Sequence, residues 1–152
     1  MRARRGVRLG YDARVKLALV FLVLAACGGA PLQTVQIMNR SPRPITELYV
    51  YPAGAANHGT SRGTVAPNGS TEVKVKQGNV EVLAVSSKLQ VDEHTRDQPS
   101  ASGTLELKGP AQVIFYDEDA KPPGLDRPGV FGFAFVIPKA KTAPPADQPT
   151  GE

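Results

Sequence analysis

The stretch TEVKVKQGNVEVLAV, residues 71–85, alternates apolar and polar side chains with the period of a β-strand. In residues 71–76, Val73 and Val75 fall on one side and charged residues on the other, so we expect one face of this strand to be exposed to solvent. Gln77-Gly78-Asn79 is typical of a turn. We therefore predict a hairpin in which residues 71–76 pair with residues 80–85.

Segments with strand character lie on both sides of this hairpin. They are residues 34–38, 45–51, 88–91, 105–108, 112–116 and 130–137. We expect 105–108 and 112–116 to form a second hairpin across Gly109-Pro110. No segment beyond the first 26 residues carries apolar residues at helical spacing. About seven short strands separated by turns predict an all-β domain, a single antiparallel β-sandwich of the immunoglobulin-like kind.

The last of these segments carries three phenylalanines. Phe131, Phe133 and Phe135 alternate, so they share one face of a strand. Three phenylalanines lined up in water would form an apolar patch that is uncommon on a soluble monomer. We expect all three to point into the sandwich, with Phe133, the middle one, the most buried.

The first 26 residues show the three-part order of a secretory signal peptide. A basic stretch comes first, residues 17–24 are apolar, and Ala25-Ala26 follow. The apolar run is much shorter than the roughly 20 residues that cross a bilayer as a helix. This length disfavours a transmembrane helix and favours a leader that is removed.

Leu24-Ala25-Ala26-Cys27 resembles the lipobox of bacterial lipoproteins. The resemblance implies that the leader is cut before Cys27, that the thiol receives a diacylglycerol, and that the new amino terminus is acylated. Two or three acyl chains hold a protein stably at a bilayer, whereas one chain does so only marginally. Gly28 stands where, in that family, aspartate favours retention in the inner membrane. The resemblance therefore implies a lipid-anchored protein of the outer membrane, on its periplasmic side or at the surface.

The rest of the chain is expected to divide into a tether, a domain and a tail. We expect residues 27–33 to be a lipidated tether and residues 34–138 to be the β-sandwich. Residues 139–152 are rich in Pro and Ala without a periodic pattern, so we expect a disordered tail.

A second resemblance rests on the strand ITELYVYPAG (45–54), the loop NHGTSRG (57–63), the turn APNGS (66–70) and the strand VEVLAV (80–85). These segments are similar to those of an uncharacterised group of small secreted bacterial β-sandwich domains, over about residues 35–85. His58-Gly59 stands where that group usually has Trp-Gly. The resemblance implies a fold and an extracytoplasmic setting, and it implies no activity.

The positive net charge of +4 comes from the leader, which holds six basic residues against Asp12 alone. From Cys27 onward, 12 basic residues face 13 acidic ones. Binding to phosphates needs clustered Lys and Arg. We therefore expect no nucleic-acid partner.

The residues with the character of a ligand contact are Tyr49, Tyr51 and His58. The two tyrosines lie on the same side of their predicted strand. If they are exposed, their rings can stack on sugar rings or on a partner peptide. Otherwise they cover the rim of the core.

Two polar clusters are candidates for a metal site. They are Asp117-Glu118-Asp119 with Asp126, and Asp92-Glu93-His94 with Asp97. The first lacks the spacing and the central glycine of a calcium loop. The second has only His94 as a nitrogen ligand unless the His58 loop meets it. The chain also lacks a glycine-rich phosphate loop. We expect no catalytic residue, no metal and no cofactor.

These observations favour a membrane-anchored lipoprotein whose domain has a non-catalytic structural or protein-binding role. Its expected partners are the lipid bilayer, through acylated Cys27, and a protein or glycan. A carbohydrate- or peptidoglycan-binding module is the first alternative. An unrecognised hydrolase or metal binder is the second.

The lipobox generates a direct prediction. A fatty-acid probe should label the protein, and Cys27→Ser should abolish both the label and the membrane association, because the thiol is the site of acylation. Labelling of cells followed by membrane sedimentation measures both. A Ser variant that still sediments with membranes would show that residues 17–26 form an anchor helix instead.

Overall fold

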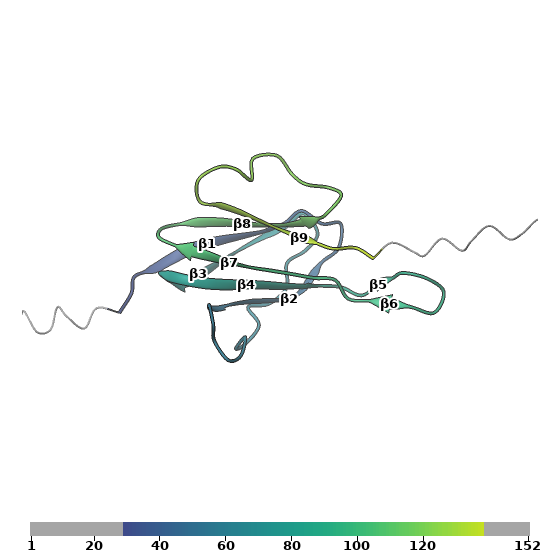
Figure 1. The fold of residues 1–152 in the computed structure, drawn as a ribbon, viewed down its shortest axis with the longest axis horizontal. Helices are drawn as coiled ribbons and strands as arrows, with labels where there is room; N and C mark the ends of the chain where they lie inside the picture. Colours follow the sequence, from purple (N-terminus) through teal and green to yellow (C-terminus); the bar gives the residue numbers. More distant parts are fainter. Residues whose placement is uncertain (1–28, 139–152) are drawn as a thin grey trace, which may run out of the picture. The chain divides into compact units, whose positions relative to one another are not determined.

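Residues 29–138, which the computed structural model describes, form nine strands and no helix (Figure 1). The all-β fold class is thus confirmed for this range. The expected leader, Cys27 and the expected tail of residues 139–152 lie outside the described residues. Within 29–138 there is also no helix that is long and apolar enough to span a membrane.

Two sheets contain seven of the strands. The four-stranded sheet has the order β3-β1-β8-β9, and the three-stranded sheet has the order β2-β4-β7. In the first sheet the strands are β1 (Leu32–Asn39), β3 (Ser70–Lys76), β8 (Ala111–Asp117) and β9 (Val130–Phe135). In the second they are β2 (Ile45–Pro52), β4 (Gly78–Ser86) and β7 (Ser100–Leu107). The short strands β5 (Leu89–Gln90) and β6 (Arg96–Asp97) form a separate hairpin.

Both predicted hairpins are wrong, although the strands themselves exist. β3 pairs with β1, whereas β4 pairs with β2 and β7. Likewise β7 pairs with β4, whereas β8 pairs with β1 and β9. At each turn the chain passes from one sheet to the other, so Val75 and Val80 reach the same core from different sheets. Alternation of apolar residues satisfies this arrangement as well as it satisfies a hairpin, because it records only which face is buried.

The four-stranded sheet is mixed, which corrects the prediction of a purely antiparallel domain. β8 runs parallel to both of its neighbours, β1 and β9. Parallel neighbours need a crossover connection, and residues 118–129 make it by passing over the outer face of the sheet (Figure 1). The outward-facing Ile114 and Tyr116 are therefore buried as well as the inward-facing Val113 and Phe115. Strands with parallel neighbours are commonly buried on both faces.

The core lies between the two sheets, and both contribute to it. Its fully buried large side chains include Ile37, Phe115 and Phe135 from the first sheet and Leu48, Val82 and Leu107 from the second. Folding removes these apolar side chains from water, and the burial of apolar surface is the main favourable term in folding.

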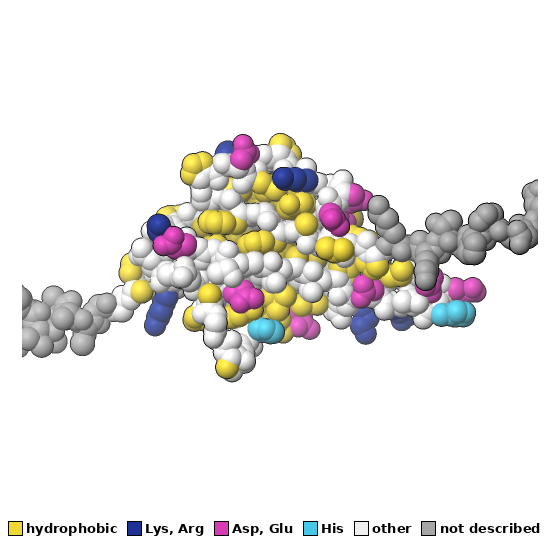
Figure 2. Space-filling view, in the orientation of Figure 1, with side chains coloured by type: hydrophobic (Ala, Val, Ile, Leu, Met, Phe, Trp, Pro, Cys, Tyr) yellow, Lys and Arg dark blue, Asp and Glu magenta, His cyan; other side chains and the backbone are white. Residues whose placement is uncertain are grey.

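The phenylalanines of β9 follow the prediction only in part. They pack against the core, but Phe135 is the fully buried one, while Phe131 and Phe133 are partly buried. Because β9 is the last strand of its sheet, Phe133 lies at the open side of the core, over Gly103 of β7. A Cβ atom at position 103 would overlap its ring. Figure 2 shows hydrophobic side chains reaching the surface on this side, over β8, β9 and β7.

A buried polar cluster joins the two sheets at one end. Arg43, between β1 and β2, donates from Nη2 to Oδ1 of Asp117 at 2.6 Å and from Nη1 to Oδ2 at 3.1 Å. Its Nε donates to Oγ of Ser86 at 3.2 Å. Asp117 ends β8 and Ser86 ends β4, so one guanidinium connects the end of each sheet. We call these three side chains the Arg43 clamp.

We predict that Asp117→Ala lowers the free energy of unfolding by up to about 3–5 kcal/mol, because it leaves a largely buried guanidinium, whose side chain is 15% exposed, without its counter-charge. The matched control is Glu106→Ala, which removes the exposed Glu106–Lys108 pair. That loss should stay below about 1 kcal/mol. Urea unfolding of the two purified variants measures the difference. Equal losses would show that the Arg43 clamp contributes no more than a surface pair.

Candidate functional site

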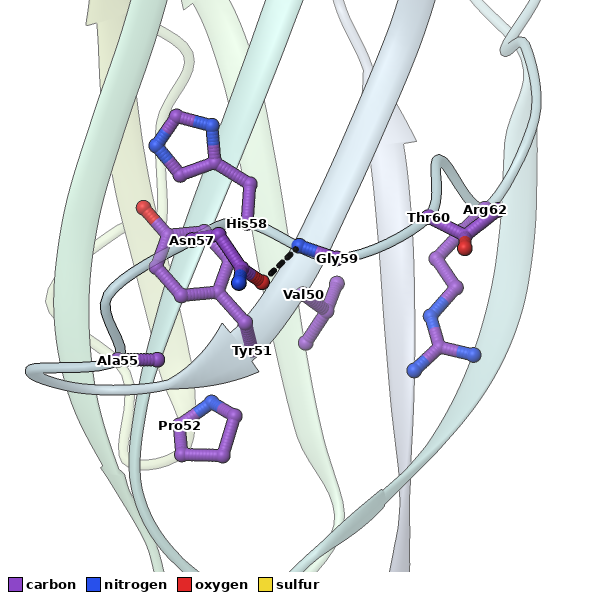
Figure 3. A pocket seen from close by; sticks show the side chains of 9 residues that line it. All are labelled: Val50, Tyr51, Pro52, Ala55, Asn57, His58, Gly59, Thr60 and Arg62. Carbon is purple, nitrogen blue, oxygen red and sulfur yellow. Dashed lines mark hydrogen bonds between the residues drawn. The ribbon is translucent and has the colours of Figure 1, made fainter.

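The loop between β2 and β3 folds back over β2 and places His58 against the rings of Tyr49 and Tyr51. Figure 3 shows His58 beside Tyr51. The loop turns at Gly54 and Gly59, which have φ angles of 79° and 71° and so suit glycine. Asn57 Oδ1 accepts a hydrogen bond from the Gly59 amide at 3.2 Å. The ring centroid of His58 lies 5.6 Å from that of Tyr49 and 5.0 Å from that of Tyr51. The three residues singled out in the sequence thus lie together.

The two tyrosines differ in exposure. Tyr51 is 7% exposed, whereas Tyr49 is half-buried and His58 is exposed. The hydroxyl of Tyr49 donates to the Glu47 carboxylate at 2.6 Å, and this bond raises the pKa of Tyr49. Loss of water around Tyr51, and then the Glu81 carboxylate, raise the pKa of Tyr51. Of the two tyrosines, Tyr49 is the one that keeps part of its ring exposed, beside the Glu47 carboxylate.

A hollow of about 340 Å³ lies between the end of β2 and this loop. Its volume falls within the range of about 300–1,000 Å³ that is usual for small-ligand sites. We call it the His58 hollow. In Figure 3, Tyr51, Asn57 and His58 stand on one side of Val50, and Thr60 and Arg62 stand on the other.

The His58 hollow opens beside an edge of the sheet that the loop covers only in part. β2 is an edge strand. Val65 exchanges two main-chain hydrogen bonds with Ile45, at 2.9 and 3.0 Å, and the Arg62 amide donates to the Leu48 carbonyl at 2.6 Å. The main-chain groups of alternate residues point to the same side of a strand. The N–H and C=O of Val50, two residues after Leu48, therefore also point away from β4, on the side where the hollow lies.

Arg62 is the charged residue among those that line this hollow. Arg62 is exposed, and the ion pairs formed within the described residues are Arg43–Asp117 and Glu106–Lys108. Arg62 thus keeps its charge uncompensated in this range. A guanidinium in that state is suited to a carboxylate or another anionic group.

The acidic clusters serve local structure. Asp117 is held by Arg43, so it is not part of a solvated loop. The Asp92 carboxylate accepts the main-chain amides of His94 and Thr95 at 2.9 and 2.8 Å, which lowers the pKa of Asp92. Within 29–138, no three His, Cys, Asp or Glu side chains gather in a way that would hold a metal ion.

Sequence reasoning found the three aromatic residues but missed Asn57 and Arg62, which complete the His58 hollow. Asn57 could have been found from its position two residues before Gly59, because an asparagine side chain often accepts a hydrogen bond from the main-chain amide two residues later in a turn. No pattern marks Arg62. Comparison of the chain with protein-family models, curated proteins and solved structures gives no match.

We predict that His58→Ala lowers the pKa of Tyr51 toward its ordinary value, because the phenol regains water when the imidazole is removed. NMR titration with carbon-labelled tyrosine rings measures this change. The control is His94→Ala, which removes an exposed histidine from the β5–β6 loop and should leave Tyr51 unchanged. An unchanged pKa in both variants would show that His58 does not shield Tyr51.

Proposed function

We propose that this chain is an outer-membrane lipoprotein, anchored through acylated Cys27, and that its domain is an immunoglobulin-like β-sandwich with a non-catalytic, protein-binding role. The lipobox at residues 24–27 supports the anchor. The His58 hollow beside the uncovered part of the β2 edge supports the binding role, and it is the observation on which that role rests.

The proposed ligand is an extended segment of a partner protein. Such segments bind by adding a strand to an exposed sheet edge, where main-chain hydrogen bonds give affinity and side-chain hollows give specificity. The loop already pairs with β2 in this way at Ile45 and Leu48 and leaves the edge before Val50. A partner segment continues that pairing at Val50, contacts the rings of His58 and Tyr49, and places an anionic group against Arg62.

A glycan is the second candidate, and the pairing of Tyr49 with Glu47 favours it. An open aromatic ring beside a carboxylate suits the stacking and hydrogen bonding of a sugar. Stacking of a sugar on both tyrosines would need both rings exposed, and Tyr51 is covered. Sedimentation with purified peptidoglycan separates the candidates, since a glycan-binding domain should cosediment and lose this property in Tyr49→Ala.

The test of protein binding is photo-crosslinking in living cells. A photoreactive phenylalanine at position 58 should give a discrete adduct with one envelope protein, because that side chain borders the hollow. The same residue at position 94, in the exposed β5–β6 loop, is the matched control and should give none. Identical adducts from both positions, or no protein adduct from position 58, would contradict the proposal.

A further inference from the structure

A second hollow lies on the outer face of the other sheet, under the crossover loop of residues 118–129. Its volume is about 500 Å³, again within the range of about 300–1,000 Å³ usual for ligand sites. β1 and β8 form its floor, and Pro122 and Pro123 of the loop form a wall. We call it the crossover hollow. Nothing in the proposed protein-binding role uses it.

Two apolar side chains, Met38 and Ile114, form part of the floor of the crossover hollow. Met38 and Ile114 are register partners on the parallel strands β1 and β8, so their side chains lie next to each other on the outer face. Met38 is half-buried although the loop passes over this face. Beyond them the floor includes Gln112, whose side-chain amide donates to Gln36 at 2.7 Å. An alkyl chain laid on Met38 and Ile114 would leave water for an apolar surface.

Two arginines, Arg40 and Arg127, line the same hollow. Both are exposed, and neither forms an ion pair with any residue of 29–138. The Nε of Arg127 donates to the Gly124 carbonyl at 3.2 Å, which orients the side chain and leaves its terminal N–H groups available. A Cβ atom at Gly124 would lie 2.6 Å from Nη2 of Arg127, so the absent side chain leaves room for the guanidinium.

We propose that the crossover hollow binds a single-chain amphiphile with an anionic head. The alkyl chain lies on Met38 and Ile114 between the strands and the two prolines. The head is bound by Arg40 and Arg127, because guanidinium groups form bidentate, charge-assisted hydrogen bonds with carboxylates and phosphates. A fatty acid and a lysophospholipid share this chemistry, and a carboxylate probe and a phosphate probe distinguish them.

The experiment is calorimetric titration of the purified protein with dodecanoate and with dodecyl phosphate, each below its micelle concentration. We expect saturable binding of one molecule of at least one of these probes. The double substitution Arg40→Gln/Arg127→Gln should weaken it about tenfold or more, because charged hydrogen bonds are lost. Lys88→Gln/Arg96→Gln removes the same charge from exposed residues near β5 and β6, and it should leave the affinity unchanged.

Two further measurements test the charge of the head group and locate the alkyl chain. Dodecyltrimethylammonium, which has the same chain and the opposite charge, should not bind. In NMR spectra with labelled methionine, the methyl group of Met38 should shift on titration with the anionic probe. Binding of the cationic amphiphile with equal affinity, equal weakening in both double variants, no binding of either anion, or shifts confined to the His58 hollow would each overturn the proposal.

Discussion

One guanidinium holds the two sheets in place at one end of the domain. The chain has a single cysteine, so no disulfide can connect the sheets within it. A buried ion pair is favourable only when its remaining hydrogen-bonding groups are also satisfied, and Arg43 meets this condition by using Nη1, Nη2 and Nε. Asn39 then holds the carbonyl of Arg43 itself at 2.7 Å. Asn39 also donates to the carbonyls of Val65 and Ala66, at 3.3 and 3.2 Å, so the same end of the domain holds the returning end of the loop that forms the His58 hollow.

The sequence predicts which residues form strands much better than it predicts which strands pair. Alternation in residues 71–76 correctly places Val73 and Val75 on one face, which is the face buried in the core. It does not choose between a hairpin and a crossing between sheets, because both bury the same face. A single residue, Gln77, separates β3 from β4. The φ angle of 135° at Gly78 shows a backbone that glycine allows at that point and that a side chain would rarely adopt.

The same limit determines how much of the candidate site the sequence predicts, because periodicity describes single strands and not the contacts between segments. The spacing of Tyr49 and Tyr51 correctly predicts a shared face, since that is a property of one strand. Their covering by His58 depends on how a loop returns to the strand, and loop paths are not recorded in periodicity. The Arg43 clamp was missed for a related reason, since its members come from three separate segments of the chain. From the sequence, a charged residue between prolines, such as Arg43, is predicted to be exposed unless its distant partner is known.

The topology accounts for both hollows. A crossover between parallel strands is usually a helix that packs along the whole sheet. Residues 118–129 contain Pro122, Pro123 and Pro128 and form no helix, so the loop contacts the sheet closely at only part of its length. Leu125 packs onto Gly132, where a Cβ atom would lie only 2.7 Å from it. Elsewhere the loop stands away from β1 and β8 and leaves the crossover hollow. The loop after β2 likewise follows its strand for only part of the edge. The two hollows thus arise on different sheets from connections too irregular to cover what they cross, so a ligand in one leaves the other open.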